Sequence, residues 1–161
     1  MNNLKLICVD ALEATATQLL PAIATVVVAQ KACRNELNVA MFGLNGKTAN
    51  RLIPNQAVSD EQLLTMLAQT TGEVILTGDA TDNIFPLLKK RSSKTLVRPA
   101  TGLSAVPTAA GVAALAWPAQ QAKQFQDPVK AMPVYSHPPN IKLSTKIDYA
   151  TLKHTNVGLH P

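Results

Sequence analysis

The spacing of apolar residues along the chain predicts six short strands. Residues 24–29, with three consecutive valines, and Glu73–Thr77 are continuous apolar segments, which is typical of buried strands. Residues 36–44 alternate apolar and polar side chains, as a strand with one buried face does. The dipeptide Asn45-Gly46 favours a two-residue hairpin turn because both residues tolerate positive φ, so the strands around it should form an antiparallel meander. Weaker patterns predict three further strands, at residues 4–9, 47–53 and 94–97.

Four helices are predicted between these strands. Asp10 with Glu13, and Ser59 with Gln62, have the spacing of capping boxes, in which two side chains satisfy free backbone amides at the helix start. The first helix should stop at Pro21, which cannot continue the helical hydrogen bonds. The expected helices cover residues 10–20, 59–70, 83–90 and 108–116, the last ended by Trp117-Pro118.

A three-strand meander followed by alternating helices and strands is the order of a ribonuclease H-like lobe. The sequence therefore predicts an α/β fold with a mixed sheet and helices packed on it. At 161 residues the chain is long enough for one domain with one core. We expect this lobe to cover residues 1–143, including an extended, proline-rich arm over residues 119–143. Residues 144–161 have too few apolar side chains to offset the entropy of ordering, which predicts a flexible tail.

Composition favours a cytoplasmic protein without membrane contact. Apolar residues make up 47% of the chain and aromatic residues only 4%, so aliphatic side chains must build the core. No apolar segment approaches the roughly 18 residues that cross a bilayer, and the start of the chain lacks the pattern of a signal peptide. In a reducing compartment Cys8 and Cys33 should stay as thiols, and we expect at least one of them to be buried.

The net charge of +5 makes nucleic-acid binding a hypothesis to consider. The densest basic run is Lys89-Lys90-Arg91, followed by Lys94 and Arg98, and no aromatic residue lies among these cations to stack on a base. A helix end whose cations complement the C-terminal dipole accounts for the run. Contact of Lys89, Lys90 and Arg91 with RNA is the alternative interpretation.

Residues that could form a catalytic centre are few and scattered. Cys33 has Lys31 and Arg34 nearby in sequence, and their charge would lower the pKa of a nucleophilic thiol, but no histidine is close enough in sequence to act as its base. Asp79 and Asp82 follow a strand end, the usual edge for sites in α/β sheets, although Gly-Asp turns more often use the carboxylate to fix the turn.

Metal, cofactor and phosphate sites also lack their usual patterns. Asp60 and Glu61 belong to a helix start, where negative charge complements the dipole. Gly43 and Gly46 span the hairpin and do not bring amides to a helix start as phosphate loops do. The histidines fall in the arm and the tail without metal-ligand spacing, at His137, His154 and His160. The sequence thus predicts no catalytic, cofactor-binding or metal-binding residue, and no cofactor.

The end of the proline-rich arm carries a family-like motif. Residues 132–142 read M-P-V-Y-S-H-P-P-N-I-K, which resembles the closing P-x-Y-x-x-P-P-x-x-K pattern of the TsaB family. Residues 6–14, L-I-C-V-D-A-L-E-A, resemble an I-G-V-S-T-L-E-A stretch from the middle of that family. Residues 107–116 resemble its P-S-A-A-x-x-x-x-L-A helix, whereas residues 31–38, K-A-C-R-N-E-L-N, keep only part of its D-A-R-R-G-E-V-Y segment.

TsaB proteins are accessory subunits in the bacterial synthesis of threonylcarbamoyladenosine on tRNA, within the glycoprotease-like group of the actin-like and sugar-kinase-like superfamily. Because the resemblance begins in the middle of the family and nothing here resembles its opening D-T-S strand, it implies the second lobe only. It implies a non-catalytic scaffold or protein-binding component, with a TsaD-like catalytic subunit and a TsaE-like ATPase as partners and tRNA contacted at most indirectly.

Three other expectations stay open. A glycoprotease-like hydrolase and a direct tRNA-binding module are alternative functions. Self-association through apolar surface, such as residues 4–9, would follow if the lobe that normally covers it is missing.

Overall fold

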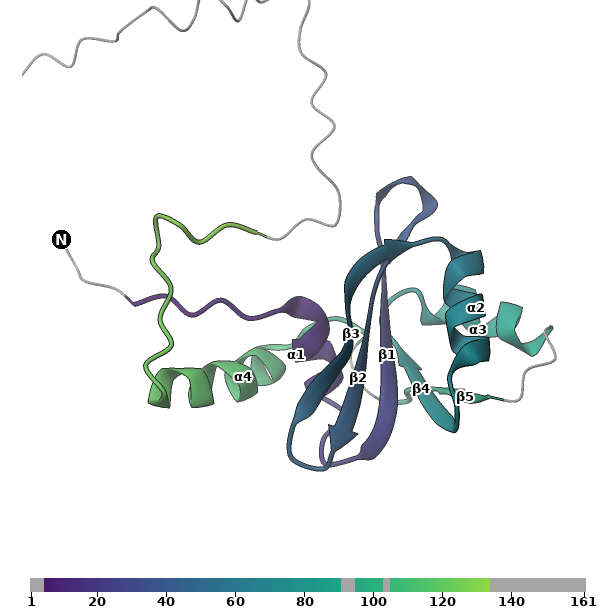
Figure 1. Cartoon of the computed structure of the whole chain (residues 1–161), viewed down its shortest axis with the longest axis horizontal. Coiled ribbons are helices and arrows are strands. Elements are labelled where there is room, and N and C mark those ends of the chain that lie inside the picture. The colour runs from purple at the N-terminus through teal and green to yellow at the C-terminus, as the bar shows by residue number, and fades with distance from the viewer. Residues whose placement is uncertain (1–4, 91–94, 103–104, 134–161) are drawn as a thin grey trace, which may run out of the picture.

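The computed structural model describes residues 5–90, 95–102 and 105–133, without the side chain of Arg34. At its centre is a five-stranded sheet with the strand order β3-β2-β1-β4-β5 (Figure 1). β1 is antiparallel to β2, which is antiparallel to β3, whereas β4 is parallel to both β1 and β5. This mixed sheet confirms the predicted α/β class and the ribonuclease H-like order. The strands are β1 (Ile23–Lys31), β2 (Leu37–Asn45), β3 (Ala49–Val58), β4 (Glu73–Thr77) and β5 (Leu96–Pro99).

Helices cover both faces of the sheet (Figure 1). α1 (Ala11–Thr17) and α4 (Ala109–Gln121) lie on one side, and α2 (Asp60–Gln69) and α3 (Thr81–Lys89) lie on the other. A short 3-10 turn, η1 (Cys33–Asn35), connects β1 to β2.

The central strand β1 is buried on both faces because its valines alternate between two cores. Val26 and Val28 pack with Phe42 beneath α1, whereas Val27 packs against α2 and α3. All three valines are completely buried. A strand that has no solvent-facing side must be apolar throughout, which is why the continuous apolar segment was a reliable signal.

The two predicted capping boxes form differently. At α2 the Ser59 hydroxyl accepts from the Gln62 amide at 3.2 Å, and the Gln62 side chain accepts from the Ser59 amide at 2.8 Å, so the reciprocal pair is complete. At α1 Asp10 accepts from the Glu13 amide at 2.9 Å, but the Glu13 carboxylate pairs with Arg51 of β3. The second half of the first box is therefore replaced by a contact between helix and sheet.

The hairpin between β2 and β3 turns one residue later than predicted. The side-chain oxygen of Asn45 accepts from the amides of Lys47 and Thr48 at 3.0 and 2.8 Å, and the Asn45 amide donates to the Thr48 carbonyl. Gly46 has a positive φ of 86°, whereas Asn45 does not. The expected centre at Asn45-Gly46 is wrong: Asn45 pairs with Thr48, so the two central residues are Gly46 and Lys47, and the Asn45 side chain binds the amides of the turn.

Two other sequence predictions are also wrong. Residues 5–9, the described part of the predicted first strand, do not join the sheet and make one bridge, between Leu6 and Gln126. A short apolar run does not distinguish a strand from an extended segment packed beside a helix. α4 continues through Pro118 to Gln121. The proline leaves the Ala114 carbonyl without a helical donor, but Ala114 is exposed, so water can satisfy that carbonyl.

The end of β4 lies against β1 with no room for a side chain. A Cβ added at Gly78 would lie 2.1 Å from the carbonyl oxygen of Ala29, and Gly78 has a φ of 106°. Gly72, just before β4, has a similar φ of 83° but nothing within 4 Å of an added Cβ. Substitutions at the two glycines therefore separate two effects on stability: the strain of a positive φ and the clash of an added Cβ with its neighbours.

We expect Gly78→Ala to destabilise the fold far more than Gly72→Ala. The Gly72 substitution should cost about 1–2 kcal/mol, the penalty of a left-handed backbone for a residue with a Cβ. The Gly78 substitution adds a clash with rigid backbone, which should raise the loss by about 1–3 kcal/mol or prevent folding. Urea unfolding followed by circular dichroism measures both, and equal losses in the two variants would contradict the close approach of β4 to β1.

Candidate functional site

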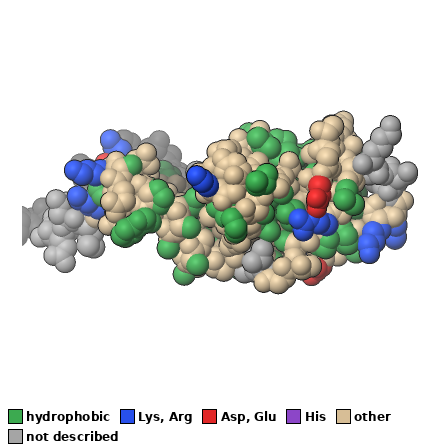
Figure 2. Space-filling view, turned by 90° about the horizontal axis from the view of Figure 1, so that it is seen from below, with side chains coloured by type: hydrophobic (Ala, Val, Ile, Leu, Met, Phe, Trp, Pro, Cys, Tyr) green, Lys and Arg blue, Asp and Glu red, His purple; other side chains and the backbone are tan. Residues whose placement is uncertain are grey.

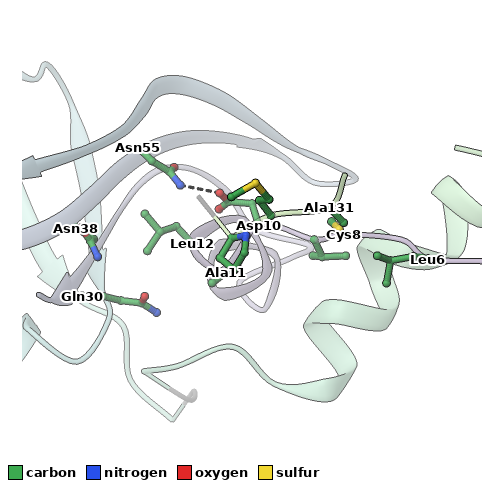
Figure 3. A pocket seen from close by; sticks show the side chains of 12 residues that line it. Leu6, Cys8, Asp10, Ala11, Leu12, Gln30, Asn38, Asn55 and Ala131 are labelled. Atoms are coloured by element: carbon green, nitrogen blue, oxygen red, sulfur yellow. Dashed lines mark hydrogen bonds between the residues drawn. The ribbon is translucent and has the colours of Figure 1, made fainter. Parts of the chain in front are cut away.

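A groove lies at one end of the sheet, on the face that carries α1 (Figure 3). Because α1 begins only at Ala11, it leaves this end of the face uncovered. Gln30 of β1 and Asn38 of β2 are register partners there, and they continue the face on which Val28 is buried. The cavity has a volume of about 650 Å³, is open to solvent and is bordered by residues from the segments 6–12 and 131–133.

The lining of the groove is mixed. Its polar part comes from Asp10 and from the amide side chains of Gln30, Asn38 and Asn55, one from each of the three antiparallel strands. Leu6 and Met132 contribute apolar walls from the two chain segments that border it. Among the described residues, no lysine or arginine lines the cavity, so this lining offers no cation to a phosphate.

A paired cluster of polar side chains forms the edge of the groove beside α1. Arg51 of β3 lies 3.2 Å from the Asp10 carboxylate and 3.1 Å from that of Glu13. Asn55 donates to the other Asp10 oxygen at 2.6 Å (Figure 3). The Asn55 side-chain oxygen accepts from Arg51. The Arg51 guanidinium also lies 4.7 Å from the centre of the Phe42 ring. The cluster thus joins the start of α1 to β3. Its side chains are partly exposed, at 29% for Arg51 and 31% for Asp10.

The charge of Asp10 is held in the ionised state. Burial opposes ionisation, but the hydrogen bonds from the Glu13 amide and from Asn55, with the charge of Arg51, outweigh it and lower the pKa of Asp10 below its ordinary value of 3.8. A carboxylate whose lone pairs are already occupied, and whose pKa is lowered, is a poor general base at neutral pH. The cluster therefore positions α1 on the sheet and offers no evident acid–base chemistry.

The candidate residues from the sequence do not meet in this site. Cys33 lies exposed in η1 with Lys31 exposed beside it, whereas Cys8 lies exposed and lines the groove. The expectation that one thiol is buried is wrong, because Cys8 belongs to a segment outside the sheet and Cys33 to a connecting turn. Asp79 accepts from the Lys31 amide at 2.7 Å and so ties the ends of β4 and β1 together.

The remaining candidates have structural positions or lie outside the described residues. Asp60 is in the first turn of α2, as predicted. Lys89 ends α3 and lies 5.0 Å from the ring centre of Phe85. Within residues 5–90, 95–102 and 105–133, no group of three or more His, Cys, Asp and Glu residues could hold a metal ion. The sequence-predicted features that lie outside the described residues are Arg91, Lys94, the three histidines, the arm beyond Pro133 and the tail.

Sequence patterns did not single out Arg51 and Asn55, which shape the site. They lie 38 and 45 residues from the partners Glu13 and Asp10 that they contact. Nothing in local spacing links positions so far apart. One available signal was a lone arginine within an otherwise uncharged strand, β3.

Comparison with known proteins supports the fold. No family model and no curated protein matches the sequence. The crystal structure of an uncharacterized protein with similarity to peptidase YeaZ from Pseudomonas aeruginosa matches with a TM-score of 0.63 at 15% identity, covering 83% of this chain and 59% of that one. YeaZ from Pseudomonas aeruginosa matches with a TM-score of 0.58 at 13% identity, covering 80% of this chain and 57% of that one.

Because the sequence identities are low, these matches establish only the fold of this chain. The chain is an α/β protein with a ribonuclease H-like sheet. More particularly, its fold is similar to that of YeaZ, the TsaB protein. The chain spans less than two thirds of the length of either neighbour. In the described part of the chain, no helix is both long and apolar enough to cross a membrane.

We expect Asp10→Asn to flatten the acid dependence of stability. The folded pKa of Asp10 lies below the unfolded one, so the unfolded chain takes up the proton first as the pH falls. The ionised carboxylate thus contributes stability that is present above the ordinary pKa of 3.8 and is lost as the pH falls through the folded value. Asparagine caps helices as well as aspartate, so the substitution removes the charge and keeps the cap.

The measurement is the free energy of unfolding in urea at about pH 7 and about pH 3. The variant should lose less stability between these two conditions than the parent does. If both lose the same amount, the charge of Asp10 is not coupled to folding and the cluster does not hold α1 on β3.

Proposed function

We propose that this chain is a non-catalytic, protein-binding component that corresponds to the second lobe of TsaB and serves tRNA threonylcarbamoyladenosine modification. The observation that carries the proposal is the unequal coverage of the fold match, 83% of this chain against 59% of the neighbour. One lobe of a two-lobed relative would give such a ratio. The motif at residues 132–142 resembles the closing segment of the family, which favours the second lobe over the first.

The chemistry of the described residues favours binding over catalysis. The carboxylates beside the groove are paired with Arg51 and Asn55, and Asp79 accepts from a backbone amide. Amide side chains and apolar walls suit recognition through hydrogen bonds and shape. These features support a scaffold role.

The proposed partners are those that the family resemblance implies. A TsaD-like catalytic subunit and a TsaE-like ATPase would bind the assembled protein in the cytoplasm, with tRNA contacted only through them. Because part of the neighbours' length has no counterpart in this chain, binding of the catalytic subunit would require the other lobe as well.

No observation favours the two alternative functions. For a hydrolase, Cys33 is the candidate nucleophile; it lies exposed in η1, and the described residues include no histidine that could act as its base. For direct tRNA binding, Lys89 already lies over Phe85, in keeping with a helix end.

The proposal predicts that this chain restores the modified nucleoside in tRNA only when the first lobe is also present. The test uses Pseudomonas aeruginosa cells depleted of YeaZ. One culture expresses this chain alone, a second expresses this chain together with the first lobe of YeaZ, and a third expresses intact YeaZ. Mass spectrometry of digested tRNA then measures threonylcarbamoyladenosine. We expect intact YeaZ and the two-lobe combination to restore it, and the chain alone to leave it low.

The Gly78→Ala variant with the first lobe serves as the control for folding of this chain, and it should not restore the nucleoside. If the parent chain and the first lobe purify together but the nucleoside stays low, the chain does not act as this lobe. Full restoration by the chain alone would contradict the assignment of a single lobe.

A further inference from the structure

The groove beside α1 leaves apolar surface open to water. Leu6 and Met132 both line it, and they are 37% and 81% exposed. Covering such surface is favourable, by about 25 cal/mol for each Å² removed from water. The floor of the groove sets a second condition, because the amide side chain of Gln30 needs a hydrogen-bond partner once it is covered. A fitting occupant is therefore apolar along its body and polar at its tip.

The occupant should also be uncharged. Asp10 is the one charged side chain among the described residues of the lining, and Arg51 already pairs with it. The cations of the bordering segments have other contacts, since Lys5 lies over an aromatic ring and Lys130 lies 4.0 Å from Asp127. Seen from below, Lys and Arg side chains gather at the outer tip of the α4 end of the molecule (Figure 2). A charged occupant would thus lose its hydration without gaining an ion pair.

The chain itself supplies such a segment directly after its described part. Pro133, the last described residue, lines the groove, and the sequence continues V-Y-S-H-P-P-N-I before the next Lys, Arg, Asp or Glu, at Lys142. A tyrosine combines an apolar ring with a phenol that can both donate and accept a hydrogen bond. Tyr135 therefore matches the apolar walls and the amide floor together.

The short tether favours Tyr135 over a peptide from another protein. Two residues span at most about 7 Å, so the backbone at Tyr135 stays within that distance of Pro133. A group on so short a tether has an effective concentration in the millimolar range, which a free peptide would have to exceed. Pro138 and Pro139 restrict the backbone of the segment, and this lowers the entropy that docking removes.

We propose that the groove is the docking site of the chain's own Tyr135, whose ring packs against the apolar walls and whose phenol meets the amide floor. This contact joins a described groove to a residue outside the described part of the chain. Another protein would reach the groove only by displacing the tyrosine. Because the contact lies within one chain, it is independent of the function proposed above, and either can fail without the other.

The two thiols of the chain provide the readout. Cys8 lines the groove, whereas Cys33 is exposed in η1 and is not part of the lining. Docking should shield Cys8 from iodoacetamide, and Cys33 is the reference within the same molecule. A side chain docked about nine-tenths of the time leaves Cys8 open about one-tenth of the time, so its labelling should be about tenfold slower than in the open groove. Mass spectrometry of the digested protein measures the two labelling rates separately.

Two matched variants of the full chain identify the occupant. Tyr135→Ser removes the ring and should speed the labelling of Cys8 about tenfold, with the rate at Cys33 unchanged. Tyr149→Ser removes the other tyrosine of the chain, which belongs to the tail, and should change neither rate. Far-ultraviolet circular dichroism checks that both variants are folded.

Nitration tests the same contact without a substitution, and it decides the matter if Tyr135→Ser does not fold. In the parent chain, tetranitromethane should modify Tyr135 about tenfold more slowly than Tyr149, because the docked ring is covered. Equal nitration of the two tyrosines would overturn the proposal, as would labelling of Cys8 that Tyr135→Ser leaves unchanged. Equal acceleration by both serine variants would show a general effect of the arm and tail and overturn the assignment to Tyr135.

Discussion

Strand β1 is hydrogen-bonded along both edges and packed on both faces, and its register determines where the other elements lie. Its antiparallel pairing with β2 places Gln30 opposite Asn38 at the floor of the groove. Its parallel pairing with β4 brings Gly78 against Ala29. Because side chains alternate along a strand, a shift by one residue would exchange the two cores and carry the polar floor to the opposite face. The groove therefore depends on the same pairing that builds the cores.

The cluster around Arg51 has a different role. Its ion pairs are partly exposed, and such pairs contribute only about 0–1 kcal/mol each. These ion pairs instead fix the position of α1: the Arg51 guanidinium holds two carboxylates at the start of the helix and so sets where α1 lies along β3. β3 is an edge strand, and Pro54 and the charged Arg51 within it discourage another chain from extending the sheet there.

The sequence was most informative where a single local rule decides the structure. The valines of β1 and the Ser59–Gln62 capping box follow from burial and from spacing within a few residues, so both were predictable. The end of α4 was missed because the effect of Pro118 depends on whether water reaches the Ala114 carbonyl, which is a property of the folded surface. The contact of Asn55 with Asp10 joins residues 45 positions apart, and only the assembled sheet brings them together.

The two borders of the described fold lie side by side. Leu6 and Gln126 form an isolated antiparallel bridge, and the Cys8 amide donates to the Gln126 side chain at 2.9 Å. The chain continues from there to Met132, which lines the groove together with Leu6, so the backbone enters and leaves the described fold on the same side, beside the groove. A domain of this kind can be inserted into a loop of another protein, or have its order of elements permuted by joining the two borders, without stretching the core. In such an arrangement, any further domain attached at either border would be carried next to the groove, away from α2 and α3 on the other side of the sheet.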